Sequence, residues 1–170
     1  MYDWLGERAA VDAIWSAMAK GLRAVGLQAP DTLDRDTPAD RAWISSDLLI
    51  GETCGLPYRA RLSDCVGLVG TLDFGLPDAP PGQYYSVIVV GRDAPGRGLA
   101  DFAGARLALN AADSQSGWAA MAEEAQTAGV RFSATRITGA HAESARAVAR
   151  GEADIAPLDA SVRASPQNGF

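Results

Sequence analysis

The chain has 170 residues, of which 48% are hydrophobic and 21% charged, and this composition is typical of a folded globular protein rather than a disordered one. Its formal net charge of −6 has the wrong sign for a protein that neutralises nucleic-acid phosphates, which argues against nucleic acid as a partner. Since the net charge also opposes any anionic ligand, such a ligand needs local donors, and helix N-termini supply them.

Membrane, metal and redox signals are sparse. The longest apolar run, residues 87–90, has the length of a strand, and residues 1–8 show neither the basic nor the apolar region of a secretory signal. His141 is the single histidine and stands at no zinc-ligand spacing, so neither a metal nor a cofactor is expected. Cys54 and Cys65 are the two cysteines, and the sequence leaves open whether they form a disulfide.

The first half of the chain reads as helix, loop and short strands. Apolar residues at three- and four-residue intervals predict a helix over residues 7–25, and a Pro- and Asp-rich loop follows over 28–41. Two short strands are predicted at 47–51 and 66–70, with a turn and a short helix near 58–63 between them. This alternation indicates an α/β lobe with mainly parallel strands.

The second half reads as a further α/β lobe. Residues 76–82 form the densest Pro/Gly stretch and predict a boundary between a first lobe at 1–82 and a second at 83–170. In the second lobe we predict strands at 84–90, 106–110, 130–137 and 153–158, and helical segments at 99–102, 116–128 and 142–150.

The strongest functional signal is the junction between the strand at 106–110 and the helix that follows it, where Ser114, Gln115, Ser116 and Gly117 stand. Unpaired N–H groups, serine hydroxyls and a glycine that permits close approach make such a junction an oxyanion cradle. The alternative is that Asp113, Ser114 or Ser116 only caps the helix.

One loop is too weak for micromolar binding, which takes about 8 kcal/mol against about 1.5–3 for each charge-assisted hydrogen bond. A second strand-to-helix junction, with His141 and Ser144, is therefore expected to converge on the same ligand. For His141 the alternative is a surface or capping histidine that binds nothing.

Ser116, His141 and Asp159 also admit a serine-hydrolase triad, because they stand at three separate strand ends. The Gly-x-Ser-x-Gly elbow is absent, and the order Ser, His, Asp does not match that of α/β-hydrolases. A hydrolase is therefore the lesser alternative to a binding protein without catalytic residues.

Six segments in order along the chain, at 1–3, 51–58, 81–85, 113–117, 138–141 and 158–160, together carry a family resemblance. They resemble the phosphate/phosphonate-type periplasmic solute-binding proteins of ABC transporters. The resemblance implies a two-lobed type II periplasmic-binding-protein fold with mainly parallel sheets and flanking helices, which closes by a hinge motion on a small oxyanion-bearing ligand. It further implies a non-enzymatic transport role, a periplasmic location and an ABC transporter permease as partner.

By position, the resemblance assigns the anionic group of the ligand to Ser114, Ser116 and Gly117, in a site centred on residues 114–117 that includes Gln115, and it makes His141 an anion contact. It places Asp159 near the hinge, where a carboxylate suits a ligand amine, while the alternative for Asp159 is a strand-end cap. Tyr58 and Tyr85 are expected to close the cleft from the other side.

Three departures from the family pattern affect these expectations. The family's opening strand before residue 2 is missing, and the tail at 161–170 reads as neither the family's helix nor its return crossing. Since such losses expose sheet edges, a homodimer is a plausible assembly. Glu52 stands where an uncharged amide is expected and repels an anion, so the ligand is left open, as is a sensory rather than a transport role.

Overall fold

The computed structural model describes residues 8–94 and 96–164, and the resemblance segment at 1–3 and the end of the tail at 165–170 lie outside this part. The chain divides into two compact units, one formed by Met1–Thr53 with Arg61–Gly67, the other by Cys54–Ala60 with Leu68–Phe170. The lobes at 1–82 and 83–170 stay a prediction.

The first unit is built on one long helix, α1 (Arg8–Ala24), which confirms the helix predicted over 7–25. Trp15 and Ala19 are buried on one face of α1 and pack with Ala29, against which three further apolar side chains lie, those of Leu22, Leu33 and Ile50. Arg23 donates from Nε and Nη2 to the carbonyl of Ala29, at 3.0 and 2.7 Å, and so ties the loop after α1 back to the helix. A short helix, α2 (Ala39–Ala42), ends this loop.

The two strands predicted in the first half are wrong, because residues 47–51 and 66–70 form turns and irregular structure. The Leu48 amide donates to the Ser45 carbonyl at 3.2 Å, which is a turn contact, and Leu68 and Val69 are 65% and 84% exposed. A strand needs a neighbouring strand for its backbone hydrogen bonds, and neither segment has one in the described part of the chain. Between them lie α3 (Gly55–Pro57) and the wide helical turn η1 (Tyr58–Leu62), close to the helix predicted at 58–63.

The second unit contains a four-stranded sheet in the order β1-β4-β2-β3. The four strands predicted in this half are present with shorter bounds, as β1 (Ser86–Val90), β2 (Arg106–Leu109), β3 (Ala134–Ile137) and β4 (Ile155–Asp159). β2 is parallel to β3 and β4, whereas β1 is antiparallel to β4, so the sheet is mixed rather than uniformly parallel. The helical segments are η2 (Leu99–Phe102), η3 (Gln115–Ala119), α4 (Ala120–Thr127), α5 (His141–Ala149) and α6 (Ala160–Ala164).

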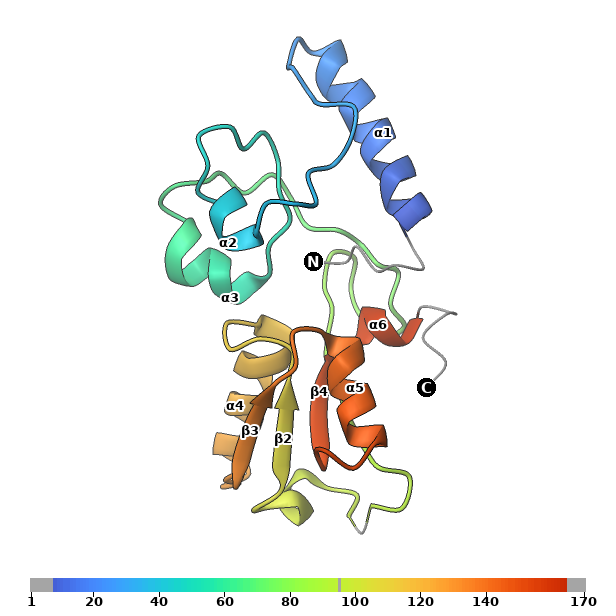
Figure 1. The fold of residues 1–170 in the computed structure, drawn as a ribbon, viewed down its shortest axis with the longest axis vertical. Coiled ribbons are helices and arrows are strands. Elements are labelled where there is room, and N and C mark those ends of the chain that lie inside the picture. Colours follow the sequence, from blue (N-terminus) through green and yellow to red (C-terminus); the bar gives the residue numbers. More distant parts are fainter. Residues whose placement is uncertain (1–7, 95, 165–170) are drawn as a thin grey trace. The chain divides into compact units, whose positions relative to one another are not determined.

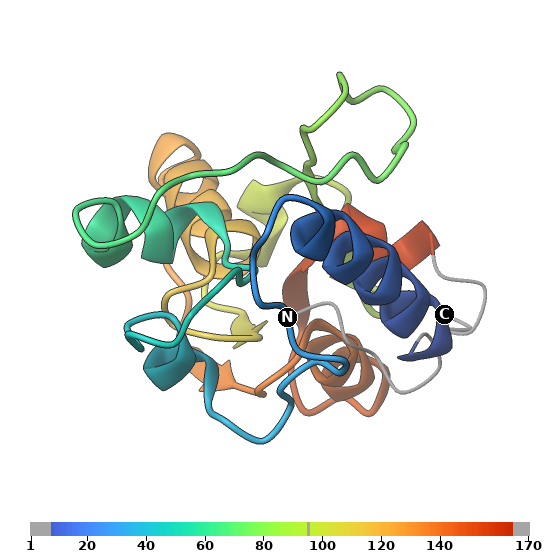
Figure 2. The same cartoon turned by 90° about the horizontal axis from the view of Figure 1, so that it is seen from above.

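Helices cover both faces of this sheet, with α4 on one face and α5 on the other (Figures 1 and 2). Alternate residues of β2 divide between the layers, since Ala108 packs with α5 whereas Leu107 and Leu109 pack with Met121 of α4. The α5 layer is rich in alanine, which brings this helix close to the sheet. The second unit is therefore an α/β layer structure with two small cores.

The tail prediction needs one correction, because residues 160–164 form the helix α6 directly after β4. Its first amides are capped by the last residue of β4, as described below, and this cap explains why a helix begins without a helical apolar pattern.

Candidate functional site

Three parallel strands deliver the polar residues of the second unit to one edge of the sheet. β2 is followed by Asn110 and then η3, β3 by Thr138 and then α5, and β4 ends at Asp159 before α6. Carboxyl ends of parallel strands share an edge, and ligands of open α/β sheets bind there. The Thr138 amide donates to the Leu109 carbonyl at 2.7 Å, which holds the first two of these ends together.

The first turn of the helical stretch at 115–127 has a distinct donor arrangement. Ser114 is its N-cap, and its Oγ accepts the Gly117 N–H at 3.0 Å, while the Gln115 N–H donates to the sulfur of Cys54 at 3.3 Å. The Ser116 N–H has no acceptor within residues 8–94 and 96–164. Ser114 therefore caps the helix, which was the alternative interpretation of its sequence position. This cap leaves the Ser116 N–H open to a ligand.

Gly117 lies where a side chain has no room. A Cβ on Gly117 would stand 2.1 Å from Oδ1 of Asn110 and 3.1 Å from Oγ of Ser114. Oδ1 of Asn110 is itself buried without a hydrogen-bond partner in the described residues. The strand end and the helix start are therefore in close contact at this glycine, next to an unsatisfied polar atom.

The structure brings Ser116 and His141 together across the two junctions. Oγ of Ser116 lies 3.1 Å from Nε2 of His141, the first residue of α5, and Ser116 is 4% exposed. The loop that presents His141 is held by Thr138, whose Oγ1 lies 2.7 Å from Oγ of the fully buried Ser144. Ser144 thus positions the loop and does not face a ligand.

His141 is held in its neutral form. Burial lowers the pKa of His141, and the charge of Asp159 and the carbonyl of Pro157 oppose this shift only in part. Nδ1 is buried and forms no well-aligned hydrogen bond within the described residues. At pH 7 the ring therefore offers a neutral donor or acceptor to a ligand rather than a positive charge.

Asp159 is completely buried, and its Oδ1 accepts both the N–H and the hydroxyl of Ser161, at 2.9 and 2.6 Å. These contacts make Asp159 the cap of α6, which was one of the two interpretations open from the sequence. They fix the side chain at the edge of the sheet.

A segment before the sheet reaches η3. Nη2 of Arg59 donates to Oε1 of Gln115 at 2.8 Å, close to the Cys54 sulfur contact. Burial raises the pKa of the Cys54 thiol, and the nearby Asp113 and Asp159 raise it further, against hydrogen bonds from Gln115 and Leu56. Cys54 is buried and Cys65 exposed, and the structure has no disulfide at either.

The tyrosines near this edge of the sheet differ in burial and in the charges around them. Tyr84, which was not predicted, is half-buried, and burial together with Cys54 and Asp159 raises its pKa to about 12 although Arg59 opposes the shift. Tyr85 is 40% exposed. Neither its hydroxyl nor that of Tyr58 forms a hydrogen bond within the part of the chain that the structure describes. Since neighbouring residues of an extended chain point to opposite sides, Tyr84 and Tyr85 have different surroundings, and the charge of Asp159 acts on Tyr84.

The part of the chain that matches a known protein family lies in the second unit. Residues 74–168 match the family described as ABC transporter, phosphonate, periplasmic substrate-binding protein. The chain belongs to this family. Among curated proteins, none matches it. The family consists of substrate-binding proteins rather than enzymes, its members are periplasmic, and a solute-binding role for this chain follows from membership.

The hydrolase alternative loses support within this family. A triad needs a carboxylate that orients Nδ1 of the histidine, but Nδ1 of His141 forms no such bond in the described residues, and Oδ1 of Asp159 is bonded to Ser161. The contact between Ser116 and His141 is therefore a dyad of hydrogen-bonding groups without the third member of a triad.

No group of three or more His, Cys, Asp or Glu side chains in the described residues is arranged to hold a metal ion. No helix in the same residues has the length and apolar character that crossing a membrane requires.

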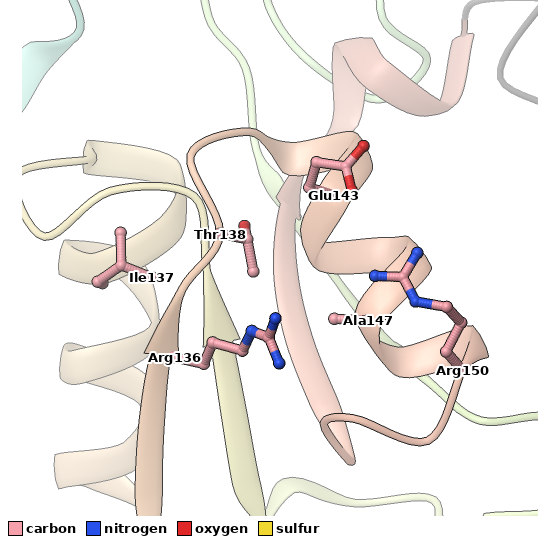
Figure 3. A pocket seen from close by; sticks show the side chains of 6 residues that line it. All are labelled: Arg136, Ile137, Thr138, Glu143, Ala147 and Arg150. Atoms are coloured by element: carbon pink, nitrogen blue, oxygen red, sulfur yellow. The ribbon is translucent and has the colours of Figure 1, made fainter.

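A separate hollow of about 110 Å³ lies between β3 and α5 (Figure 3). Arg136 is directed from β3 toward α5, where Glu143 and Arg150 stand. Arg136 and Arg150 both pair with Glu152, at 3.1 and 2.7 Å. The two arginines of this hollow thus pair with a carboxylate at the surface, and the hollow lies apart from the Ser116 junction.

The neutral state of His141 predicts a pH dependence of stability. Its pKa is lower in the folded than in the unfolded chain, where the ordinary value is about 6.5, so the unfolded chain binds more protons as the pH falls below that value. The stabilisation is complete above about pH 6.5 and is lost as the pH falls toward the folded-state pKa, with a slope of at most about 1.4 kcal/mol per pH unit.

Urea denaturation between about pH 7.5 and 5.5 measures this slope, and His141→Gln is expected to flatten it. The comparison is clean because the chain has no other histidine. An unchanged slope in His141→Gln contradicts the assignment.

Proposed function

We propose that the protein is the solute-binding component of an ABC-type phosphate/phosphonate-like transport system, and that it captures a small oxyanion at the start of η3. The observation that carries the proposal is the open Ser116 N–H, which stands beside a serine hydroxyl in contact with a neutral imidazole. Hydroxyl, amide and imidazole N–H groups are the donors that an oxyanion needs when it loses water.

The resemblance of the site segments to this family supports the remaining assignments. Ser114 and Gly117 shape the cradle, Gln115 leads its first turn, and His141 is its second donor. Asp159, at the edge of the sheet, carries the negative charge that suits a ligand amine, and Tyr58 and Tyr85 close the site as two lobes of a type II fold come together. The bound protein then delivers its ligand to an ABC transporter permease in the periplasm.

A thermal-shift measurement with methylphosphonate, inorganic phosphate and sulfate tests the proposal. At a hundredfold excess over the dissociation constant, a ligand adds about 2.7 kcal/mol to the folded state, which raises the melting temperature by about 5–10 °C in a protein of this size. Ser116→Ala is expected to abolish the shift because it removes a donor next to the open amide.

The matched control is Ser133→Ala, since Ser133 is an exposed serine whose hydroxyl has only a long contact of 3.4 Å to the Ala105 carbonyl. This variant is expected to keep the full shift. An equal shift in Ser116→Ala would place the ligand elsewhere. Covalent labelling of Ser116 by a serine-directed phosphonylating probe, together with ester turnover, would favour the hydrolase.

A further inference from the structure

Arg59 is held over the start of η3 by contacts that no part of the proposed function has used. Its Nη2 donates to Oε1 of Gln115 at 2.8 Å. A Cβ on Gly55 would stand 3.1 Å from Nη1 of Arg59 and 3.6 Å from the Gln115 side chain, so the guanidinium folds back over this glycine. Cys54 accepts the Gln115 N–H, so the segment 54–59 forms hydrogen bonds with both the backbone and the side chain of Gln115.

Two negative charges act close to the contacts between the segment 54–59 and Gln115. Asp113 and Asp159 both act on the Cys54 thiol and raise its pKa, and the buried His141 carries no charge at pH 7. The positive charge of Arg59 opposes the rise in the pKa of Tyr84, so it acts on the same group of side chains. An arriving anion thus meets two carboxylates, neutral donors and one guanidinium that is fixed beside the cradle.

We infer that Arg59, anchored by Gln115, selects doubly charged oxyanions over singly charged ones. This inference rests on the proposed function and names its substrate class. N–H and hydroxyl donors serve either kind of anion, whereas the attraction of a full positive charge grows in proportion to the charge of the ligand. The guanidinium has five N–H donors, and its bond to Gln115 leaves the others for the oxygens of a tetrahedral dianion.

Isothermal titration with two probes of the same head group tests the selection. At about pH 8.5 methylphosphonate carries two charges, whereas its monomethyl ester carries one, because esterification removes the second ionisable oxygen. The native protein is expected to bind the dianion at least about tenfold more tightly than the ester. Arg59→Gln is expected to lower the affinity for the dianion about tenfold or more, and the affinity for the ester less than about threefold.

Gln115→Glu tests the same charge without removing Arg59. The substitution keeps the size of the side chain and places a carboxylate on the guanidinium, so it neutralises the cation and is expected to reproduce the selective loss. It also serves if Arg59→Gln fails to fold, which circular dichroism and the melting temperature report. The matched control is Arg131→Gln, which changes the net charge equally at an exposed arginine before β3, at the opposite end of the sheet.

The outcomes separate this inference from the function on which it rests. If Ser116→Ala abolishes binding while Arg59→Gln and Gln115→Glu behave like Arg131→Gln, charge selection by Arg59 is overturned and the binding function stands. An equal loss for both probes in Arg59→Gln also overturns it, because that result indicates a contact without charge discrimination. If the native protein binds neither probe, the proposed function fails and the inference fails with it.

Discussion

Gly117→Ala is expected to lower the free energy of unfolding by about 2 kcal/mol, although alanine is the better helix former. The added Cβ would stand 2.1 Å from Oδ1 of Asn110 and 3.2 Å from Cβ of Ser114, so either the strand end or the cap has to move. Over-packing of a close contact costs about 1–3 kcal/mol, and partial loss of the Ser114 cap adds to it. Urea denaturation measures the change, and the melting temperature is expected to fall by about 4–8 °C.

Gly21→Ala is the matched control, because Gly21 lies inside α1 with nothing within 4 Å of its Cβ position. There the same substitution is expected to stabilise by up to about 1 kcal/mol. A second check is Asn110→Ala, which removes the atom that the new methyl group meets. In that background Gly117→Ala is expected to cost much less, and an undiminished cost would show that the Asn110 contact is not the cause.

Local pattern predicts those parts of this chain whose structure is decided locally. The helix α1 follows from apolar spacing, and the strands of the second unit follow from short apolar runs that find partners in one sheet. The segments 47–51 and 66–70 have the same strand-like composition but no partner strand in the described residues, so their backbone turns instead. A strand forms only where a neighbouring strand completes its backbone hydrogen bonds, and the sequence of one segment does not show whether such a neighbour exists.

Some residues of the candidate site could likewise be predicted from local pattern, and others could not. Ser116 and His141 could be predicted because each follows a parallel strand, and such strand ends share an edge. Tyr84, whose pKa is raised by burial and by the nearby Cys54 and Asp159, was not predicted, because a shift of one residue reverses the side to which a side chain points. Arg59 and its bond to Gln115 join positions 56 residues apart through an irregular segment, and no periodic pattern marks such a contact.

Asp159→Ala is expected to lower the free energy of unfolding by about 2–3 kcal/mol. The carboxylate accepts the N–H and the hydroxyl of Ser161 in a buried setting, and truncation leaves both donors without it. Charge-assisted bonds of this kind contribute about 1.5–3 kcal/mol. Asp159→Asn keeps an acceptor oxygen and is expected to cost less, as is Ser161→Ala, which removes only the hydroxyl bond. Chemical denaturation of the three variants gives the order.

Binding measurements on the same variants decide whether Asp159 does more than cap α6. If its carboxylate also receives a ligand amine, Asp159→Asn is expected to lower the affinity for 2-aminoethylphosphonate about tenfold or more, and the affinity for ethylphosphonate little. Only the first probe carries the positive charge that the carboxylate attracts. Ser161→Ala keeps the carboxylate and is expected to bind both probes as the native protein does. Equal affinities for the two probes in the native protein and in Asp159→Asn would leave Asp159 with the cap alone, since a structural role does not discriminate between ligands that differ only by an amine.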